Sequence, residues 1–186
     1  TSDTSFIVND NLIPANTTNQ ATICETDRKI LEAIPSGGTW GIVSGGGSIV
    51  LPDDYYPANI ANDTSVTIRY TTPGNGACPS NSDDATFIVQ PLYNPTVAFD
   101  TSSMCINEKR LIEGSPSGGY FTVLSGPGSI GISGDTLLAN GAGTIQFEYD
   151  YINVCGVVSD THSVVVNPSP NPVITSPDNN LCEGSD

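Results

Sequence analysis

The chain has 186 residues, with 5 basic and 20 acidic side chains and a formal net charge of −15. This excess of negative charge opposes approach to nucleic acid phosphates or an anionic membrane surface, so a nucleic acid partner is excluded. With 19 Gly, 14 Pro and a single Met, the composition is rich in turn formers and poor in helix formers, and it predicts an all-β fold.

The segments of the first half of the chain recur in the second half. Cys24 corresponds to Cys105, 81 positions later, and Cys78 corresponds to Cys155, 77 positions later. Between them, Pro35-Ser-Gly-Gly-Thr-Trp40 returns as Pro116-Ser-Gly-Gly-Tyr-Phe121. Self-similarity at a fixed period is the signature of a repeat architecture. We therefore expect tandem repeats.

Both ends of the sequence resemble parts of the same repeat. Ser5-Phe-Ile-Val-Asn9 matches Thr86-Phe-Ile-Val-Gln90, and Leu181-Cys-Glu-Gly184 matches Ile23-Cys-Glu-Thr26. We expect the C-terminal strand of a preceding repeat in residues 1–9, two complete repeats, and the start of a following repeat. The predicted boundaries of the three later segments are 10–91, 92–168 and 169–186.

Each repeat reads as short strands separated by turn residues, the pattern of an Ig-like or PKD-like β-sandwich. Residues 144–151 alternate cleanly, which places Ile145 and Phe147 on the packed face and Glu148 and Asp150 on the face toward water. The strands expected in the second repeat are Thr96–Phe99, Arg110–Glu113, Tyr120–Leu124, Ile130–Ile132, Thr136–Leu138, Thr144–Tyr151 and Val157–Val166.

The segment 34–50 holds six glycines and invites comparison with a phosphate-binding loop. In the second repeat Gly46 is replaced by Pro127, which has no N–H to donate. The segment also lacks the Lys-Ser/Thr of a P-loop. We therefore expect turns, with positive backbone φ at Gly47 and Gly128. The predicted turn glycines are Gly37, Gly38, Gly47, Gly118, Gly119 and Gly128.

Four aromatic residues are predicted to anchor the cores of the two repeats. These are Trp40 and Tyr70 in the first repeat, and Phe121 and Tyr149 at the equivalent positions of the second. Large aromatic side chains dominate the cores of small domains. For Trp40, a solvent-facing platform for sugar is the functional alternative.

The five cysteines fit the repeat frame as pairs within repeats. We expect disulfides Cys24–Cys78 and Cys105–Cys155, each contributing roughly 4 kcal/mol, and we expect Cys182 to lack a partner because its repeat is incomplete. A zinc site is excluded by the absence of C-x-x-C spacing. Disulfides indicate the periplasm, the cell surface or the exterior.

Short proline-marked linkers, Pro91–Pro95 and Pro168–Pro172, are expected to restrict bending between repeats, so that an array of them is a semi-rigid rod. No apolar run is long enough to span a membrane, and we expect no membrane insertion.

Catalytic chemistry finds little support. His162 is the only histidine, and its equivalent position in the first repeat is Ala85. The paired carboxylates Asp53-Asp54 and Asp83-Asp84 each lose one member in the second repeat, so glycosidase-like chemistry is not favoured. We expect no enzyme, no resident metal and no cofactor.

Calcium stays open as an alternative ligand. Acidic and amide residues gather in three loops, and oxygen ligands of this kind suit calcium. The loops are Asn9-Asp-Asn11, Asp53-Asp54 and Asp178-Asn-Asn180.

Together, the cysteine positions, Pro-Ser-Gly-Gly-Thr-Trp, Ser-Gly-x-Gly-Ser-Ile and Ile-Arg-Tyr or Phe-Glu-Tyr resemble the Ig-like or PKD-like repeats of very large Bacteroidota surface proteins. Those include the SprB-type gliding-motility adhesins, which are substrates of the type 9 secretion system. The resemblance implies the stalk of a cell-surface adhesin associated with the outer membrane. The implied partners are neighbouring repeats, the outer-membrane secretion and gliding machinery, and surface polysaccharide or another substratum.

A second class of function stays open beside the stalk. The rival is a carbohydrate-binding module of an extracellular protein or enzyme, in which loops such as 52–63 hold sugar, with or without calcium.

Overall fold

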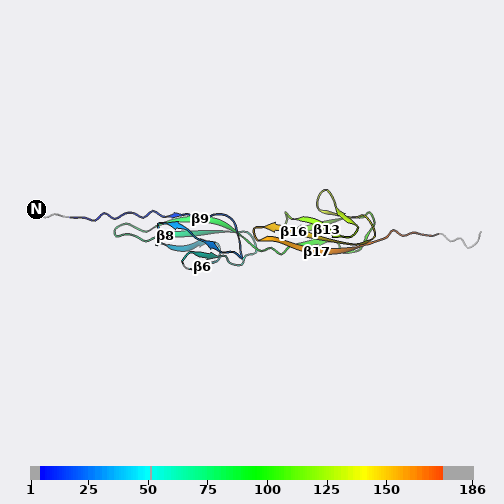
Figure 1. The fold of residues 1–186 in the computed structure, drawn as a ribbon, viewed down its shortest axis with the longest axis horizontal. Coiled ribbons are helices and arrows are strands. Elements are labelled where there is room, and N and C mark those ends of the chain that lie inside the picture. Colours follow the sequence, from blue (N-terminus) through cyan, green and yellow to red (C-terminus); the bar gives the residue numbers. More distant parts are fainter. Residues whose placement is uncertain (1–4, 51, 174–186) are drawn as a thin grey trace, which may run out of the picture. The chain divides into compact units, whose positions relative to one another are not determined.

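The fold is all-β, as the composition predicts. The computed structural model describes residues 5–50 and 52–173, and within these ranges the chain forms strands and turns with no helix. Contacts divide the chain into two units (Figure 1). The first unit contains the described residues up to Pro95, together with Pro116–Gly119 and Asp150–Ser159. The second contains Thr96–Ser115, Tyr120–Tyr149 and the described residues from Asp160 onward.

In the first unit, two sheets form a sandwich, with a short additional pair at one side. One sheet has the order β2-β9-β8-β5, the second has the order β3-β7-β6, and the pair is β1-β4. The strands are β1 (Ala15–Asn16), β2 (Ile23–Cys24), β3 (Lys29–Ile30), β4 (Ala33–Ile34), β5 (Thr39–Ser44), β6 (Ser48–Val50), β7 (Asp54–Tyr56), β8 (Thr64–Thr72) and β9 (Asn81–Gln90).

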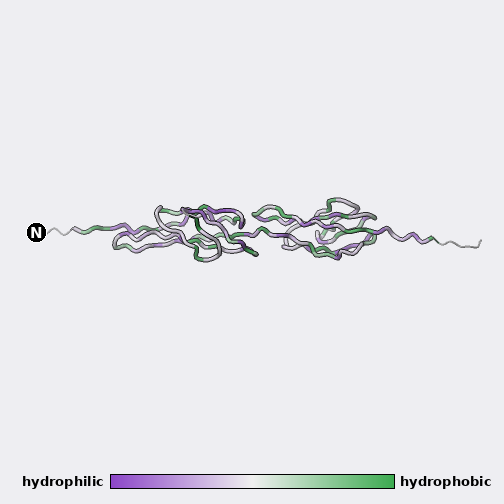
Figure 2. Tube along the Cα trace, turned by 90° about the horizontal axis from the view of Figure 1, so that it is seen from below, coloured by the Kyte–Doolittle hydropathy of each residue, from purple (hydrophilic) through white to green (hydrophobic). Residues whose placement is uncertain are grey.

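The hairpin of β8 and β9 is the longest ladder of the first unit. Thr64 pairs with Val89 at one end of the hairpin, and Thr72 pairs with Asn81 at the other. Along β8, apolar side chains alternate with polar ones, so that Val66, Ile68 and Tyr70 are buried. The alternation of apolar and hydrophilic residues along the trace is visible in Figure 2.

The core of the first unit lies between its two sheets. Val66, Ile68, Phe87 and Val89 come from the four-stranded sheet, while Tyr55 comes from the three-stranded sheet. The rings of Tyr55 and Phe87 meet edge to face with centroids 5.4 Å apart. This geometry is favoured between aromatic rings, and it fixes how the two sheets face each other.

Two further sheets, β11-β17-β16-β13 and β10-β12-β15-β14, are built from the second half of the chain. Their buried cluster includes Ile112, Leu137, Ile145 and Phe147. The strands are β10 (Thr96–Phe99), β11 (Met104–Cys105), β12 (Lys109–Ser115), β13 (Tyr120–Ser125), β14 (Gly128–Ile130), β15 (Thr136–Ala139), β16 (Gly143–Asn153) and β17 (Gly156–Asn167).

Each strand expected in the second repeat overlaps an observed one, and two details differ. The short β11 was not expected, because two residues are too few to show a period. Asp150 was expected to face water, yet it is only 9% exposed. Its carboxylate accepts a hydrogen bond from the Ser159 hydroxyl, which offsets part of the cost of burial.

Protein groups pack against the glycine-rich segment. Tyr55 is fully buried, and its hydroxyl donates to the Gly46 carbonyl oxygen at 2.5 Å. Gly47 has φ of 121°, as expected, but Gly128 does not have a positive φ. It lies in β14, where a Cβ atom would come within 2.7 Å of the Ile145 side chain. Close packing, and not backbone conformation, therefore calls for glycine at position 128.

The Pro-Ser-Gly-Gly turn is held by Tyr70. The Tyr70 hydroxyl donates to the Pro35 carbonyl oxygen at 2.5 Å and accepts from the Gly38 N–H at 2.7 Å. Gly37 has φ of 91°, a conformation that favours glycine. A Cβ atom at Gly38 would lie 2.5 Å from the Tyr70 ring. Gly37, Gly38 and Tyr70 thus stabilise the same turn.

Candidate functional site

Among the described residues, a disulfide joins Cys24 to Cys155, with Cα atoms 4.9 Å apart and a sequence separation of 131. The predicted bridges Cys24–Cys78 and Cys105–Cys155 are therefore wrong. Cys78 and Cys105 carry free thiols. The bond connects β2, in the first repeat of the sequence, to the turn between β16 and β17, in the second repeat. Cys182 lies outside the described residues.

Strand geometry explains the correction. Strand β2 runs parallel to the end of β9, with Cys24 opposite Gln90. Cys78 lies beyond the other end of β9, before Asn81. Ten residues of extended strand span about 30 Å, while two bridged cysteines need Cα atoms within about 7 Å. Cys24 and Cys78 are therefore at opposite ends of the same sheet.

The turn that carries Cys155 is docked on the linker through main-chain and amide contacts. The Asn153 side-chain amide donates to the Pro91 carbonyl oxygen at 3.0 Å, and the Val154 N–H donates to the Gln90 side-chain oxygen at 3.3 Å. Cys155 Sγ lies 3.5 Å from the Gln90 carbonyl oxygen. These contacts bring the two sulfurs of the bridge together.

Two carboxylates also contact the linker or the chain beside it. Glu25 accepts hydrogen bonds from the N–H groups of Ile60 and Leu92, at 3.0 and 2.9 Å. The Tyr93 hydroxyl donates to Asp63 at 3.2 Å. Burial raises the pKa of Tyr93, and the negative charge of Asp63 raises it further. Both carboxylates therefore act as structural acceptors.

The Tyr93 ring also meets the Tyr151 ring edge to face, with centroids 5.3 Å apart. The linker thus combines a covalent bond, hydrogen bonds and an aromatic contact, all within the first unit. This arrangement holds chain segments together and offers no reacting group.

A buried cation in each repeat fixes the loop that leads to the first cysteine. Lys29 Nζ donates to the carbonyl oxygens of Asn19 and Ala21 at 2.6 and 2.9 Å, and it lies 4.6 Å above the centre of the Phe87 ring. Burial lowers the pKa of Lys29. Its charge is thus used to satisfy main-chain oxygens of the loop before Cys24.

Arg110 does the same in the second repeat. Its guanidinium donates to the carbonyl oxygens of Asp100, at 2.6 Å, and Ser102, and it pairs with Glu108 at 2.7 Å. The two carbonyl groups, of Asp100 and Ser102, correspond to those of Asn19 and Ala21 after the same shift of 81 positions, whereas the pairing with Glu108 has no counterpart among the contacts of Lys29. Sequence reasoning missed both residues, although the repeat alignment of these two basic side chains was the available signal.

The predicted aromatic anchors lie at the positions expected of core residues. Tyr70 and Tyr149 are 3% and 2% exposed, and Trp40 and Phe121 are partly buried against the two apolar clusters. The ring centroids of Trp40 and Tyr70 are 4.6 Å apart, and those of Phe121 and Tyr149 are 4.8 Å apart. Trp40 is therefore half shielded, rather than a free platform for sugar.

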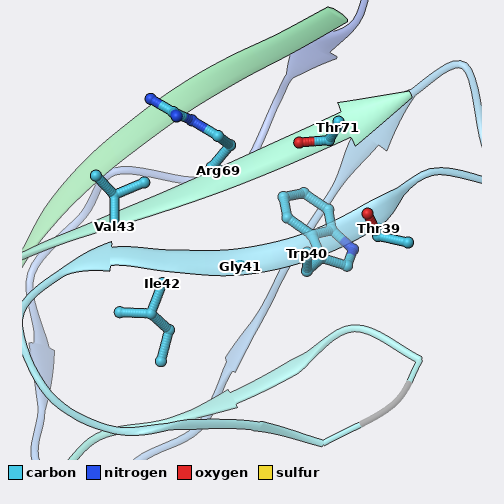
Figure 3. Close-up of a pocket in the computed structure, with 7 residues that line it drawn as sticks. All are labelled: Thr39, Trp40, Gly41, Ile42, Val43, Arg69 and Thr71. Carbon is cyan, nitrogen blue, oxygen red and sulfur yellow. The ribbon is translucent and has the colours of Figure 1, made fainter. Parts of the chain in front are cut away.

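One surface hollow lies over the pair β5 and β8, next to Trp40 (Figure 3). Its volume is about 320 Å³, and a Cβ atom at Gly41 would meet no atom within 4 Å. Arg69, at its edge, is already paired with Asp84 by two hydrogen bonds of 2.8 Å. The hollow thus exists because Gly41 lacks a side chain. The guanidinium of Arg69 already has a partner in Asp84.

A second hollow, of about 530 Å³, is lined by Trp40, Tyr70, Glu32, Pro52 and Asp53, among others. It includes the beginning of the loop proposed above to hold carbohydrate. It combines two aromatic side chains, Trp40 and Tyr70, with the carboxylates of Glu32 and Asp53, and sugar recognition uses groups of both kinds. The carbohydrate function can therefore be tested at this hollow.

The acidic pairs weighed as catalytic groups have separate structural partners. Asp54 pairs with Arg28 at 2.8 Å, and Asp83 accepts a hydrogen bond from the Asn16 N–H at 2.8 Å. The pKa of Asp84 is lowered by its hydrogen bonds from Arg69. Asp54, Asp83 and Asp84 are thus engaged with three different segments, through Arg28, Asn16 and Arg69.

His162 contacts the core rather than a nucleophile. Its Nε2 lies 2.8 Å from Asp160, whose carboxylate also accepts the Val97 N–H at 3.0 Å. The imidazole meets the Phe99 ring edge to face at 5.2 Å. No serine or cysteine of residues 5–50 and 52–173 is hydrogen-bonded to it. The pair therefore ties β17 to the neighbourhood of β10.

Metal ligands do not converge in the part of the chain that the structure describes. No group of three or more His, Cys, Asp or Glu side chains is placed there to hold a metal ion. Asn11, from one of the acidic loops, accepts a hydrogen bond from the Asn81 amide at 2.7 Å. Asp178-Asn-Asn180 lies outside the described residues. Among the described residues, no helix has the length and apolar character of a transmembrane segment.

Comparison with known proteins gives structural likeness only. No protein-family model and no curated protein sequence matches the chain. Solved structures that are similar include protocadherin gammaB7 EC3–6 (11% identity, 83% of this chain and 47% of that one, TM-score 0.39) and Drosophila N-cadherin EC1–4 (10%, 86% and 50%, TM-score 0.45). Immunoglobulin domains 1–5 of Sidekick-1 are also similar (12%, 86% and 40%, TM-score 0.46).

The chain thus spans half or less of the length of each of these structures. By their descriptions, these structures consist of cadherin or immunoglobulin domains. Likenesses at these TM-scores assign no function.

Proposed function

We propose that this chain is a structural segment of a secreted surface protein, in which tandem β-sandwich repeats are joined covalently to form a stalk. The observation that carries the proposal is the disulfide Cys24–Cys155, since its two cysteines come from successive repeats of the sequence. A bond of this kind limits the separation of the repeats under load. It also requires an oxidising compartment, which fits export from the cytoplasm.

The N-terminal segment supports an array. Phe6 and Val8 are 85% and 79% exposed, whereas the equivalent residues Phe87 and Val89 are 2% and 1% exposed within β9. Ile7, between them, is 87% exposed, and an apolar run at this exposure favours a segment that a neighbouring repeat would cover. Within this array we place the two complete repeats at residues 10–91 and 92–168.

The finer assignment is a SprB-type adhesin of the outer surface, exported by the type 9 secretion system and used in gliding and attachment. The repeated motifs Pro35-Ser-Gly-Gly-Thr-Trp40 and Pro116-Ser-Gly-Gly-Tyr-Phe121 support it by resemblance. In the organism that encodes the chain, deletion of the gene should abolish gliding, and antibody to the repeats should label intact cells. Normal gliding in the deletion strain would remove the finer assignment alone.

Scattering from chains of increasing repeat number tests the stalk. The maximum dimension should rise by a constant increment with each added repeat. An increase that follows the cube root of chain mass would contradict a stalk. Parallel samples with reducing agent give the matched control, since loss of the bridge should increase the flexibility of the same chain.

The rival function is glycan binding at the hollow lined by Trp40, Glu32 and Asp53. A glycan array probed with and without calcium should show no specific binding if the chain is a spacer. Millimolar or tighter binding that the substitution Trp40→Phe removes, while the fold persists, would favour the rival.

A further inference from the structure

The two free cysteines stand at the repeat positions of the two bonded ones. Cys105 corresponds to Cys24, and Cys78 corresponds to Cys155. The described chain therefore has two first-strand cysteines, Cys24 and Cys105, and two turn cysteines, Cys155 and Cys78. One cysteine of each kind is bonded and the other is free.

Cys105 lies in the same local structure as Cys24. In the parallel pair β11 and β17, Cys105 is opposite Asn167, as Cys24 is opposite Gln90 in the pair β2 and β9. Each cysteine carbonyl accepts an N–H from the residue three positions later at 3.0 Å. Yet Cys24 is 2% exposed, while Cys105 is exposed. The equivalent position is thus open to solvent where no bridge covers it.

Cys78 repeats the approach of Cys155 to the end of a preceding strand. Cys78 Sγ donates to the Asn9 carbonyl oxygen at 3.4 Å, and Cys155 Sγ lies 3.5 Å from the Gln90 carbonyl oxygen. Asn9 and Gln90 are equivalent in the repeat. The turns themselves differ, because Cys78 follows Gly76 whereas Cys155 precedes Gly156. The sulfur nevertheless reaches the same site on the neighbouring segment.

We propose that Cys105 and Cys78 each form a disulfide with an adjoining repeat, so that every junction of the array carries one bridge of the Cys24–Cys155 kind. Cys105 bonds to the turn cysteine of a following repeat, and Cys78 bonds to the first-strand cysteine of a preceding repeat. This inference rests on the proposed tandem array.

The chemistry is a two-electron oxidation by thiol–disulfide exchange. One thiolate attacks an oxidant disulfide such as oxidised glutathione, which forms a mixed disulfide and releases one glutathione thiolate. The second cysteine thiolate then attacks the mixed disulfide, forms the protein S–S bond and releases the second glutathione. Two protein thiols are oxidised, one oxidant disulfide is reduced, and the two protons end on the glutathione thiols.

The test lengthens the 186-residue chain so that it contains one more junction between repeats. By the repeat alignment, Asp186 corresponds to Lys109, so a second copy of residues 110–167 appended after Asp186 completes a third repeat in frame. The chain is oxidised with a glutathione couple, alkylated with a maleimide, digested without reduction and mapped by mass spectrometry. The molecular mass measured without reducing agent distinguishes the two kinds of bond. A bond within one chain leaves the mass of a monomer, and a bond between copies gives the mass of a dimer.

The expected map has two bridges, Cys24–Cys155 and Cys105 to the appended copy of Cys155. Cys78 should be alkylated, because the chain has no first-strand cysteine in a preceding repeat. Cys182 should be alkylated as well, because the chain has no turn cysteine in a repeat that follows it. The substitution Cys105→Ala should make the appended copy of Cys155 reactive and leave Cys24–Cys155 in place.

Three outcomes would overturn the proposal: alkylated Cys105 in the extended chain, a Cys105–Cys182 bond, or a bond from Cys105 to a second molecule. Scattering on the same sample separates this failure from failure of the stalk. A constant increment in maximum dimension with Cys105 unbonded would keep the stalk and remove the proposed bridge.

Discussion

The substitution Tyr70→Phe tests why the Pro-Ser-Gly-Gly turn recurs in the sequence. The variant keeps the ring, which contacts Trp40, and removes only the hydroxyl that donates to Pro35 and accepts from Gly38. A hydrogen bond contributes about 1 kcal/mol net, and both main-chain groups would lose a partner in a partly buried place. We therefore expect the free energy of unfolding to fall by about 2 kcal/mol.

Fluorescence of Trp40 is a suitable probe, because it is the only tryptophan and lies in the first unit. For a unit of this size, a loss of this order lowers the melting temperature by roughly 8–16 °C. The control is Tyr56→Phe, since Tyr56 is 40% exposed. A Tyr70→Phe variant within 0.5 kcal/mol of this control would refute the role assigned to the hydroxyl.

Three further predictions concern the buried cation, an acceptor and the bridge. Lys29→Met should lower the free energy of unfolding by about 2–3 kcal/mol, while Lys29→Arg should lose much less because Arg110 serves the equivalent loop; equal losses in denaturant titrations would contradict this. The pKa of Glu108 is lowered by the Cys105 N–H and then by Arg110, so its stabilisation is present above the unfolded-state pKa and is lost as pH falls through the folded-state pKa. Glu108→Gln should therefore unfold more readily near neutral pH and match the parent in acid; a difference that is constant with pH in thermal melts would exclude this. The double change Cys24→Ala and Cys155→Ala opens a loop with a separation of 131 and should lower the free energy of equilibrium unfolding by about 5 kcal/mol; an unchanged denaturation midpoint would contradict a bridge that stabilises the fold.

Strand positions could be predicted from the sequence because the signal is local. Along residues 145–149 the buried side chains alternate as the pattern indicates, and the turn residues between strands limit the choices. The same holds for Val66, Ile68 and Tyr70 in β8. A two-residue strand such as β11 carries no such signal, and its position depends on parallel pairing with β17.

The cysteine pairing could not be predicted in the same way, because it depends on which ends of strands meet. Assigning the bridges within repeats ignored the ten residues of β9 that separate the neighbourhood of Cys78 from Gln90. Counting them would have excluded Cys24–Cys78. It would not have identified Cys155, whose place depends on contacts with the linker. The repeat alignment pairs Lys29 with Arg110 and so marks both positions, but the sequence does not show that their partners are loop carbonyls.

Non-reducing peptide mapping of the oxidised 186-residue chain tests the central claim most directly. Cross-linking from one repeat to the next predicts a single disulfide peptide joining Cys24 to Cys155, with Cys78 and Cys105 recovered as alkylated thiols. Recovery of Cys24 bonded to Cys78, together with Cys105 bonded to Cys155, would instead show repeats that are closed individually, and would contradict the covalent stalk.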